Sequence, residues 1–134
     1  MQGIINKLKQ RFWTADDGTA TVETVIMVPV FLGMLFLIVD ASMTFAYHSQ
    51  VVRAVQDANR QLSVGRITTE TQVVSLLQER LNNVTPNASI SAVISGGTIT
   101  SSVNFPLSDV LTFGSLTKLD AYTLSVSSEN YIEF

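Results

Sequence analysis

The chain has 134 residues, enough for one small domain plus an accessory segment. Charged residues make up only 14% of it, and the formal net charge of −3 gives no electrostatic support for a nucleic-acid partner. The absence of cysteine excludes disulfides, thiolate catalysis and cysteine-ligated zinc sites.

The first element in chain order is a basic stretch followed by an apolar segment. Three basic side chains come first: Lys7, Lys9 and Arg11. Residues 24–39 then carry no charged side chain. As an α-helix this segment is about 24 Å long, and extension to Tyr47 gives about 36 Å, compared with a hydrocarbon core of ~30 Å. The length therefore predicts a membrane-spanning helix.

The energetics of insertion support this prediction. The Val, Ile, Leu and Phe residues between Val25 and Val39 favour insertion by roughly 5 kcal/mol in total. Glu23 and Asp40 would each cost about 3 kcal/mol at the bilayer centre, but they lie near the two edges, where the cost is smaller. By the positive-inside rule, the basic stretch places the N-terminus in the cytoplasm and the C-terminal part outside.

Two other interpretations of the apolar segment stay open. A core helix of a soluble domain would need a larger protein to cover its apolar surface on all sides. A secretory signal would share the basic start, and cleavage after Ala41 would release a domain that begins at Ser42. Pro29 interrupts the hydrogen-bond ladder at Val25, so we expect a helix kink there, either harmless or a deliberate bend.

The long helix is predicted to continue past the membrane and to cover about residues 21–63. An apolar stripe recurs at helical spacing: Tyr47, Val51, Val55, Ala58 and Leu62. We expect this stripe to pack on its own domain, with a partner protein as the alternative. Gly65 is typical of a helix C-terminus. Thr69 and Gln72 match a capping box, which predicts a short second helix after them.

The last third of the chain is predicted to form a small antiparallel sheet. Apolar and polar residues alternate over residues 88–95, and Gly96-Gly97 indicates a two-residue hairpin before a return strand that ends at Pro106. Residues 107–119 are expected to form a loop of undefined shape. A final strand is expected where three apolar residues alternate: Tyr122, Leu124 and Val126. The predicted fold class is α+β, with one sheet face packed on the amphipathic half of the long helix.

The sequence contains no convincing catalytic or metal-ligating set. His48 is the only histidine, and no serine or carboxylate can be positioned beside it from the sequence. No phosphate-binding loop or dinucleotide motif is present. We therefore expect a structural or binding function, with no enzymatic activity, no cofactor and no metal.

The residues around Gly18 carry a more specific signal. Gly18 follows the basic stretch, and Glu23 stands five residues later at the start of the apolar helix. The stretch "GTATVETVIMVPVFLGMLFLIVD" resembles the TadE-like pseudopilins of the tight-adherence (Tad, or Flp) type IV pilus system. The shared features are the glycine-to-glutamate spacing, a proline early in the apolar run, and a C-terminal domain after the helix. The resemblance is specific over about Gly18 to Asp40.

The resemblance implies a minor pilin that primes or caps a Tad-type pilus for surface adherence. A membrane prepilin peptidase would cut between Gly18 and Thr19. The chain would then comprise a leader (1–18), a transmembrane assembly helix (19–47) and an extracytoplasmic α+β domain (48–134). It would cross the bacterial inner membrane once. Implied partners are other pilin-like subunits, the peptidase, an inner-membrane assembly platform and membrane lipid.

Elementary physical chemistry explains what such a cleavage could achieve. Cutting creates an α-amine at Thr19, and Glu23 of a neighbouring subunit could neutralise it within an apolar bundle, which would set the register of assembly. One alternative is an uncleaved single-span anchor that presents a binding domain, and another is the secreted domain. Glu23 could also simply mark the cytoplasmic end of the membrane helix. A mature N-terminus at Thr19, Met1 or Ser42 would distinguish the three. Asp40 is expected either at the outer interface or paired with a partner subunit or an assembly platform.

Overall fold

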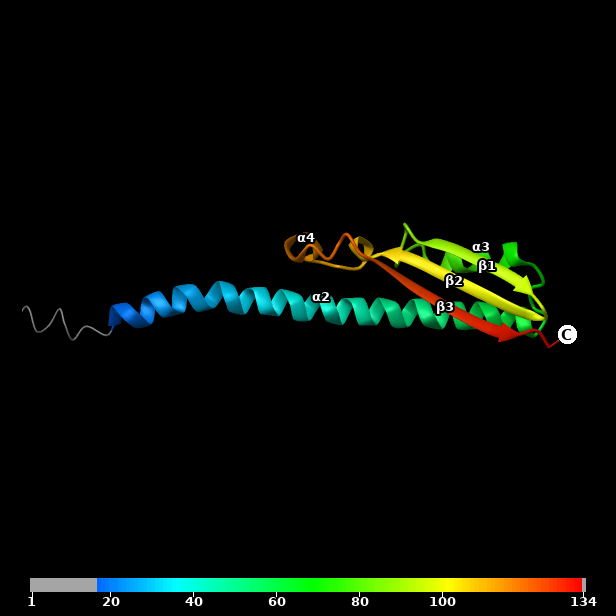
Figure 1. Cartoon of the computed structure of the whole chain (residues 1–134), viewed down its shortest axis with the longest axis horizontal. Helices are drawn as coiled ribbons and strands as arrows, with labels where there is room; N and C mark the ends of the chain where they lie inside the picture. The colour runs from blue at the N-terminus through cyan, green and yellow to red at the C-terminus, as the bar shows by residue number, and fades with distance from the viewer. Residues whose placement is uncertain (1–16, 134) are drawn as a thin grey trace, which may run out of the picture. The chain divides into compact units, whose positions relative to one another are not determined.

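The computed structural model describes the backbone of residues 17–133. Its elements in chain order are α2 (Asp17–Ser63), α3 (Glu70–Leu81), β1 (Ser89–Ser95), β2 (Thr98–Pro106), the 3-10 helix η1 (Leu107–Asp109), α4 (Gly114–Thr117) and β3 (Thr123–Tyr131) (Figure 1). The described residues fall into two compact units that divide between Phe36 and Leu37. The second unit holds the later part of α2, α3 and the sheet, and the predicted α+β class is confirmed.

Helix α2 ends where the sequence predicts and begins four residues before the predicted start at residue 21. Residues 17–20 include no proline, so nothing in this stretch prevents the helix from extending. At the other end, Gly65 has a φ of 74°, and its N–H donates to the carbonyl of Leu62 at 2.9 Å. A positive φ is readily adopted by glycine and ends the helix here.

The capping box predicted for the second helix is confirmed. The side chain of Thr69 accepts a hydrogen bond from the backbone N–H of Gln72, and the Gln72 side chain accepts one from the backbone N–H of Thr69. These reciprocal bonds satisfy two donors that a helix N-terminus otherwise leaves unpaired. Three residues of α3 are buried on one face: Val73, Leu77 and Leu81.

The sheet is antiparallel, with β2 between β1 and β3. Gly96 and Gly97 have φ values of 60° and 81°, which is the backbone conformation that a tight two-residue hairpin requires. Val103 of β2 lies opposite Ile90 of β1 and Val126 of β3, so these three residues share the inner face. The outer face is rich in serine and threonine, as the alternation predicts.

The core lies between the inner face of the sheet and the two longer helices. From α2 it contains Val51, Ala54, Val55, Ala58 and Leu62, and from β2 it contains Ile99, Val103 and Phe105. The apolar stripe on α2 therefore packs on its own domain, with Tyr47 at the edge of the cluster. One prediction for the last strand is wrong: Tyr122 precedes β3 and is exposed, whereas Leu124 and Val126 point inward as expected.

The segment predicted as a loop of undefined shape contains two short helical turns, η1 and α4. We call residues 107–122 the 107–122 loop. The N–H of Leu107 donates a hydrogen bond to the carbonyl of Tyr122 at 2.8 Å, and this bond joins the two ends of the loop. The N–H of Leu119 donates to the carbonyl of Gly114 at 3.2 Å. The segment is thus a compact surface loop held by its own backbone hydrogen bonds.

Candidate functional site

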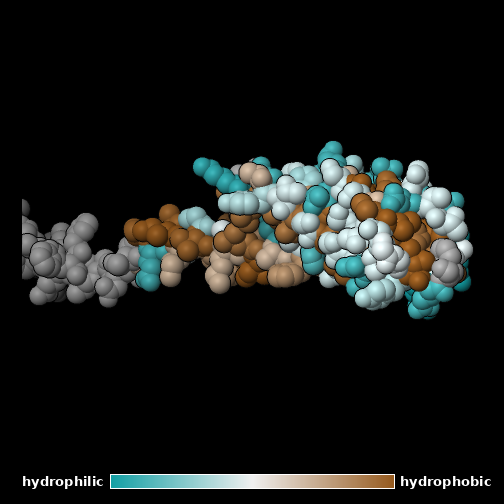
Figure 2. Space-filling view, turned by 45° about the vertical axis from the view of Figure 1, so that its right-hand side comes forward, coloured by the Kyte–Doolittle hydropathy of each residue, from teal (hydrophilic) through white to brown (hydrophobic). Residues whose placement is uncertain are grey.

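Most side chains in the first part of α2 are hydrophobic and exposed. They lie between Val22 and Val39, and Figure 2 shows this apolar surface in brown next to the residues drawn in grey. None of the most apolar 18-residue window is buried within the chain, and by length and composition α2 can cross a membrane. The interpretation as a buried core helix is therefore wrong. A surface of this kind needs lipid or other apolar helices around it.

The predicted processing site lies at the start of this helix. Gly18 and Thr19 are in the first turn of α2, and only their backbone is described. The first turn of a helix lacks part of its hydrogen-bond ladder and frays easily. The bond between the two residues thus lies in a turn that can open more readily than the middle of α2. The predicted leader, with its three basic residues, lies outside the described residues except for Asp17 and Gly18.

Glu23 is exposed and lies four residues after Thr19 on the same helix. Four residues correspond to a rise of about 6 Å, or one turn. Among residues 17–133 no ion pair or hydrogen bond of the Glu23 carboxylate is found. Its charge therefore faces outward at the edge of an apolar helix, where a partner could reach it.

Pro29 lies inside α2, and the helix continues on both sides of it. Proline has no N–H to donate, so the carbonyl of Val25 loses its usual acceptor role in the helix ladder. Pro29 and Glu23 are both on one helix in the first unit of the chain, six residues apart. The predicted bend at Pro29 stays a prediction.

Asp40 forms a contact that the sequence analysis did not anticipate. The residue is on α2 in the second unit, and it is only 1% exposed. Its Oδ1 accepts hydrogen bonds from the backbone N–H groups of Thr112 and Phe113, at 3.0 and 2.9 Å. Its Oδ2 is also buried and accepts no hydrogen bond from the described residues. Asp40 thus fastens the 107–122 loop to α2, just before α4.

The sequence did not predict this contact within the chain. The Oδ1 of Asp40 is occupied by the two N–H groups, and its position at the outer interface or beside a partner stays a prediction. A carboxylate loses its hydration when it is buried. The two backbone N–H groups that donate to it replace part of that hydration. In the sequence, Asp40 is a single charged residue inside an apolar run. A charge in such a run indicates a specific partner, but the sequence alone does not identify that partner.

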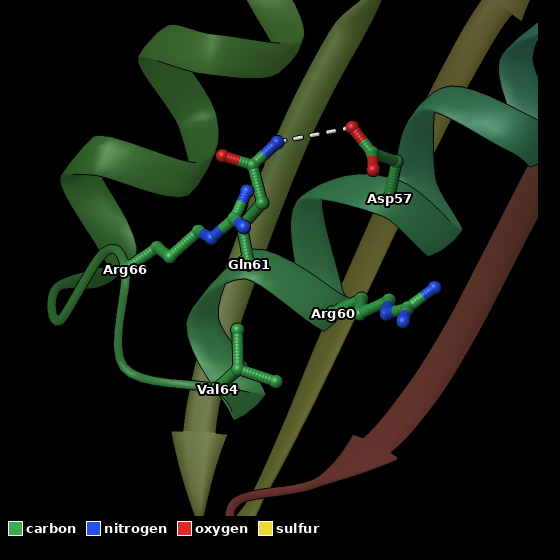
Figure 3. A pocket seen from close by; sticks show the side chains of 5 residues that line it. All are labelled: Asp57, Arg60, Gln61, Val64 and Arg66. Carbon is green, nitrogen blue, oxygen red and sulfur yellow. Dashed lines mark hydrogen bonds between the residues drawn. The ribbon is translucent and has the colours of Figure 1, made fainter.

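The described part of the folded domain has shallow hollows on its surface, one of them near the end of α2. Figure 3 shows a surface hollow lined by Asp57, Arg60, Gln61, Val64 and Arg66. The Asp57 carboxylate accepts a hydrogen bond from Gln61 and pairs with Arg80, so it is engaged in local structure. The hollow contains no nucleophile with an adjacent base. No group of three metal-ligating side chains occurs in the described part of the chain.

Comparison with protein families gives a match to the sequence of α2 and none to the sequence of the sheet. A family model described as TadE-like protein matches residues 18–60, which begins at Gly18 and includes Glu23, Pro29 and Asp40. No curated protein and no solved structure matches the sequence. The resemblance stated from the sequence is therefore confirmed over this segment. The matched segment includes the exposed apolar part of α2, which by length and composition can cross a membrane, and the match and this helix together are consistent with membrane anchoring.

Proposed function

We propose that this chain, which is TadE-like over residues 18–60, is a minor pilin of a Tad-type pilus. In this role it primes or caps assembly of a filament used for surface adherence. It is a structural subunit, so its function lies in binding other subunits through α2 and presenting the α+β domain. The observation that carries the proposal is an exposed apolar helix that starts at Gly18, carries Glu23 one turn later and leads into a small folded domain.

Processing by a prepilin peptidase would prepare the helix for assembly. Removal of residues 1–18 takes the basic leader off the membrane surface and creates an α-amine at Thr19. Within an apolar bundle an unpaired charge is costly, so the amine and the Glu23 carboxylate of a neighbouring subunit would come together. Subunits then stop at the axial position where these charges meet. Pro29, farther along α2, would allow the helix to bend against its neighbours.

The location follows from the same elements. The N-terminus would be cytoplasmic, α2 would cross the bacterial inner membrane once over about residues 19–47, and residues 48–134 would lie outside. The bonds from Thr112 and Phe113 to Asp40 support retention of α2 on the domain. Cleavage after Ala41 would remove Asp40 and expose those two N–H groups, which argues against the secreted form.

The direct test is the intact mass of the protein purified from membranes of its native cell. The proposal predicts a chain that begins at Thr19. A Gly18→Ala variant, whose added methyl group hinders close approach of a peptidase, should retain residues 1–18. A native chain that still begins at Met1 would reject the pilin proposal and favour an uncleaved anchor that presents a binding domain. A chain that begins at Ser42 would favour secretion.

The proposed partners can be tested in the same cells. Cross-linking should join the chain to other pilin-like subunits and to an inner-membrane assembly platform. The shared contact surface would be the apolar face of α2 between Val22 and Val39, because most hydrophobic side chains in this range are exposed.

A further inference from the structure

The 107–122 loop lies beside α2 at the level of Asp40. The hydrogen bonds from Thr112 and Phe113 to Asp40 fix this position, and Figure 1 shows α4 next to α2. The contact joins segments 72 and 73 residues apart. The end of the loop that carries α4 is therefore placed along α2 by a specific residue rather than by general packing.

The level of Asp40 along α2 is close to the outer edge of a membrane. Within the proposed membrane segment 19–47, the uncharged run begins at Thr24, and a hydrocarbon core of ~30 Å takes up about 20 helical residues from there, so it ends near Met43. Asp40 lies about 4.5 Å before that point. Three exposed hydrophobic residues directly precede it: Leu37, Ile38 and Val39. A loop bound to Asp40 consequently meets the membrane surface.

The outward side chains of this loop suit such a surface. Leu116 is 69% exposed, Tyr122 is 63% exposed, and Leu119 is also exposed. Among the residues with described exposure after Phe45, only three other large hydrophobic residues are exposed: Val64, Val93 and Tyr131. The exposed hydrophobic side chains of the folded domain are thus concentrated in the loop that Asp40 holds.

The charges of the loop favour a hydrophobic contact over an electrostatic one. The loop carries one basic residue, Lys118, and two acidic residues, Asp109 and Asp120, so its net charge is −1 and it has no basic patch for anionic headgroups. The Asp109 carboxylate already accepts hydrogen bonds from Asn87. A tyrosine with an apolar ring and a polar hydroxyl is well suited to the headgroup level of a bilayer. Leucines suit the boundary between headgroups and acyl chains.

We propose that the 107–122 loop is a second membrane contact of this chain. Leu116 and Leu119 enter the headgroup–acyl boundary of the outer leaflet, and Tyr122 stays at headgroup level. The Asp40 contact holds the loop at this depth and at the same time covers the Asp40 carboxylate from lipid. The inference rests on the membrane anchoring that forms part of the proposed function, and it adds a second contact with the bilayer to the one made by α2.

The absence of cysteine makes a direct test practical. Single-cysteine variants Val30→Cys, Leu116→Cys and Val93→Cys of the full chain carry a nitroxide label in phosphatidylcholine vesicles. Collision rates with oxygen, which partitions into lipid, and with a water-soluble nickel chelate report the environment of each label. Val30 is in the apolar run, and Val93 is an exposed β1 residue of the folded domain, so both serve as matched controls.

The expected result is an oxygen-to-nickel ratio at Leu116 several-fold above that at Val93 and below that at Val30. In an Asp40→Ala background the Leu116 ratio should fall towards that of Val93. A Leu116 label as water-accessible as Val93 overturns the inference and leaves anchoring intact, provided that Val30 is in lipid. A Leu116 label shielded from both probes points to a neighbouring protein and also overturns it. A water-accessible Val30 label rejects membrane anchoring and the inference together.

Discussion

The side-chain oxygen of Asn59 accepts a hydrogen bond from the hydroxyl of Ser101, although the two residues are 42 positions apart and both are buried. The Asn59 amide nitrogen donates to the carbonyl of Ser128 at 2.9 Å. Ser101 and Ser128 face each other on β2 and β3. One amide therefore ties α2 to both strands, and the two small serines leave room for it in an otherwise apolar core.

Replacing Asn59 with alanine should destabilise the folded domain by about 1–3 kcal/mol, because the buried Ser101 hydroxyl then loses its partner. Chemical denaturation of the full chain in detergent, followed by circular dichroism, measures this change. Gln50→Ala on the exposed side of the same helix is the control, and its effect should stay within about 0.5 kcal/mol. Equal effects of the two variants would show that the buried amide has no special role.

The sequence alone could predict features set by neighbours along the chain. The capping box of α3 needs only residues three apart, and the Gly96-Gly97 turn and strand alternation are equally local. The sequence could not place Asn59 in the core, because asparagine is mostly exposed and its hydrogen-bond partners are distant in sequence. The contact between Asp40 and Thr112 was missed for the same reason, since the 107–122 loop has no periodicity from which its position follows.

Asp40 offers a local test of how the loop is held. In Asp40→Ala the N–H groups of Thr112 and Phe113 lose their acceptor, and hydrogen bonds to charged groups contribute about 1.5–3 kcal/mol. Their amide exchange in the detergent-solubilised chain should accelerate about tenfold or more, since every 1.4 kcal/mol is about tenfold. Exchange at Val103 in the core should not change.

Two variants separate charge from hydrogen bonding at this position. Asp40→Asn keeps an oxygen that can accept both N–H groups, so its effect on exchange should be smaller than that of alanine. Asp120→Ala removes an exposed carboxylate from the same loop and should change nothing at Thr112. If Asp120→Ala and Asp40→Ala accelerate exchange equally, the loop responds to net charge and not to the Asp40 contact.

The capping box gives a third prediction. Thr69→Ala removes the side-chain acceptor of the Gln72 N–H, and loss of an N-cap threonine typically costs about 1 kcal/mol. The midpoint of denaturant unfolding should shift accordingly. Thr68→Ala is the matched control, because only the backbone N–H of Thr68 contacts Gln72. A shift of the same size in both variants would assign the effect to threonine content rather than to the cap.

Glu23 tests the proposed assembly mechanism. Glu23→Ala removes the carboxylate at the membrane edge but leaves the apolar run from Val25 to Val39 unchanged, so the chain should still enter the membrane fraction in normal amounts. Loss of one partner of a desolvated charge pair costs about 2–5 kcal/mol, and the Thr19 amine of the neighbouring subunit would lose its partner. Incorporation into sheared pili should therefore fall by about tenfold or more.

The control for this prediction is a variant at a second acidic residue, far from the start of α2. Glu79 is exposed on α3, and Glu79→Ala should assemble as the unmodified chain does. Quantitative immunoblots of the membrane and pilus fractions of each variant supply both readouts. Normal incorporation of Glu23→Ala would mean that the carboxylate only marks the end of the membrane helix. Register between subunits would then depend on the packing of the apolar side chains of α2 alone.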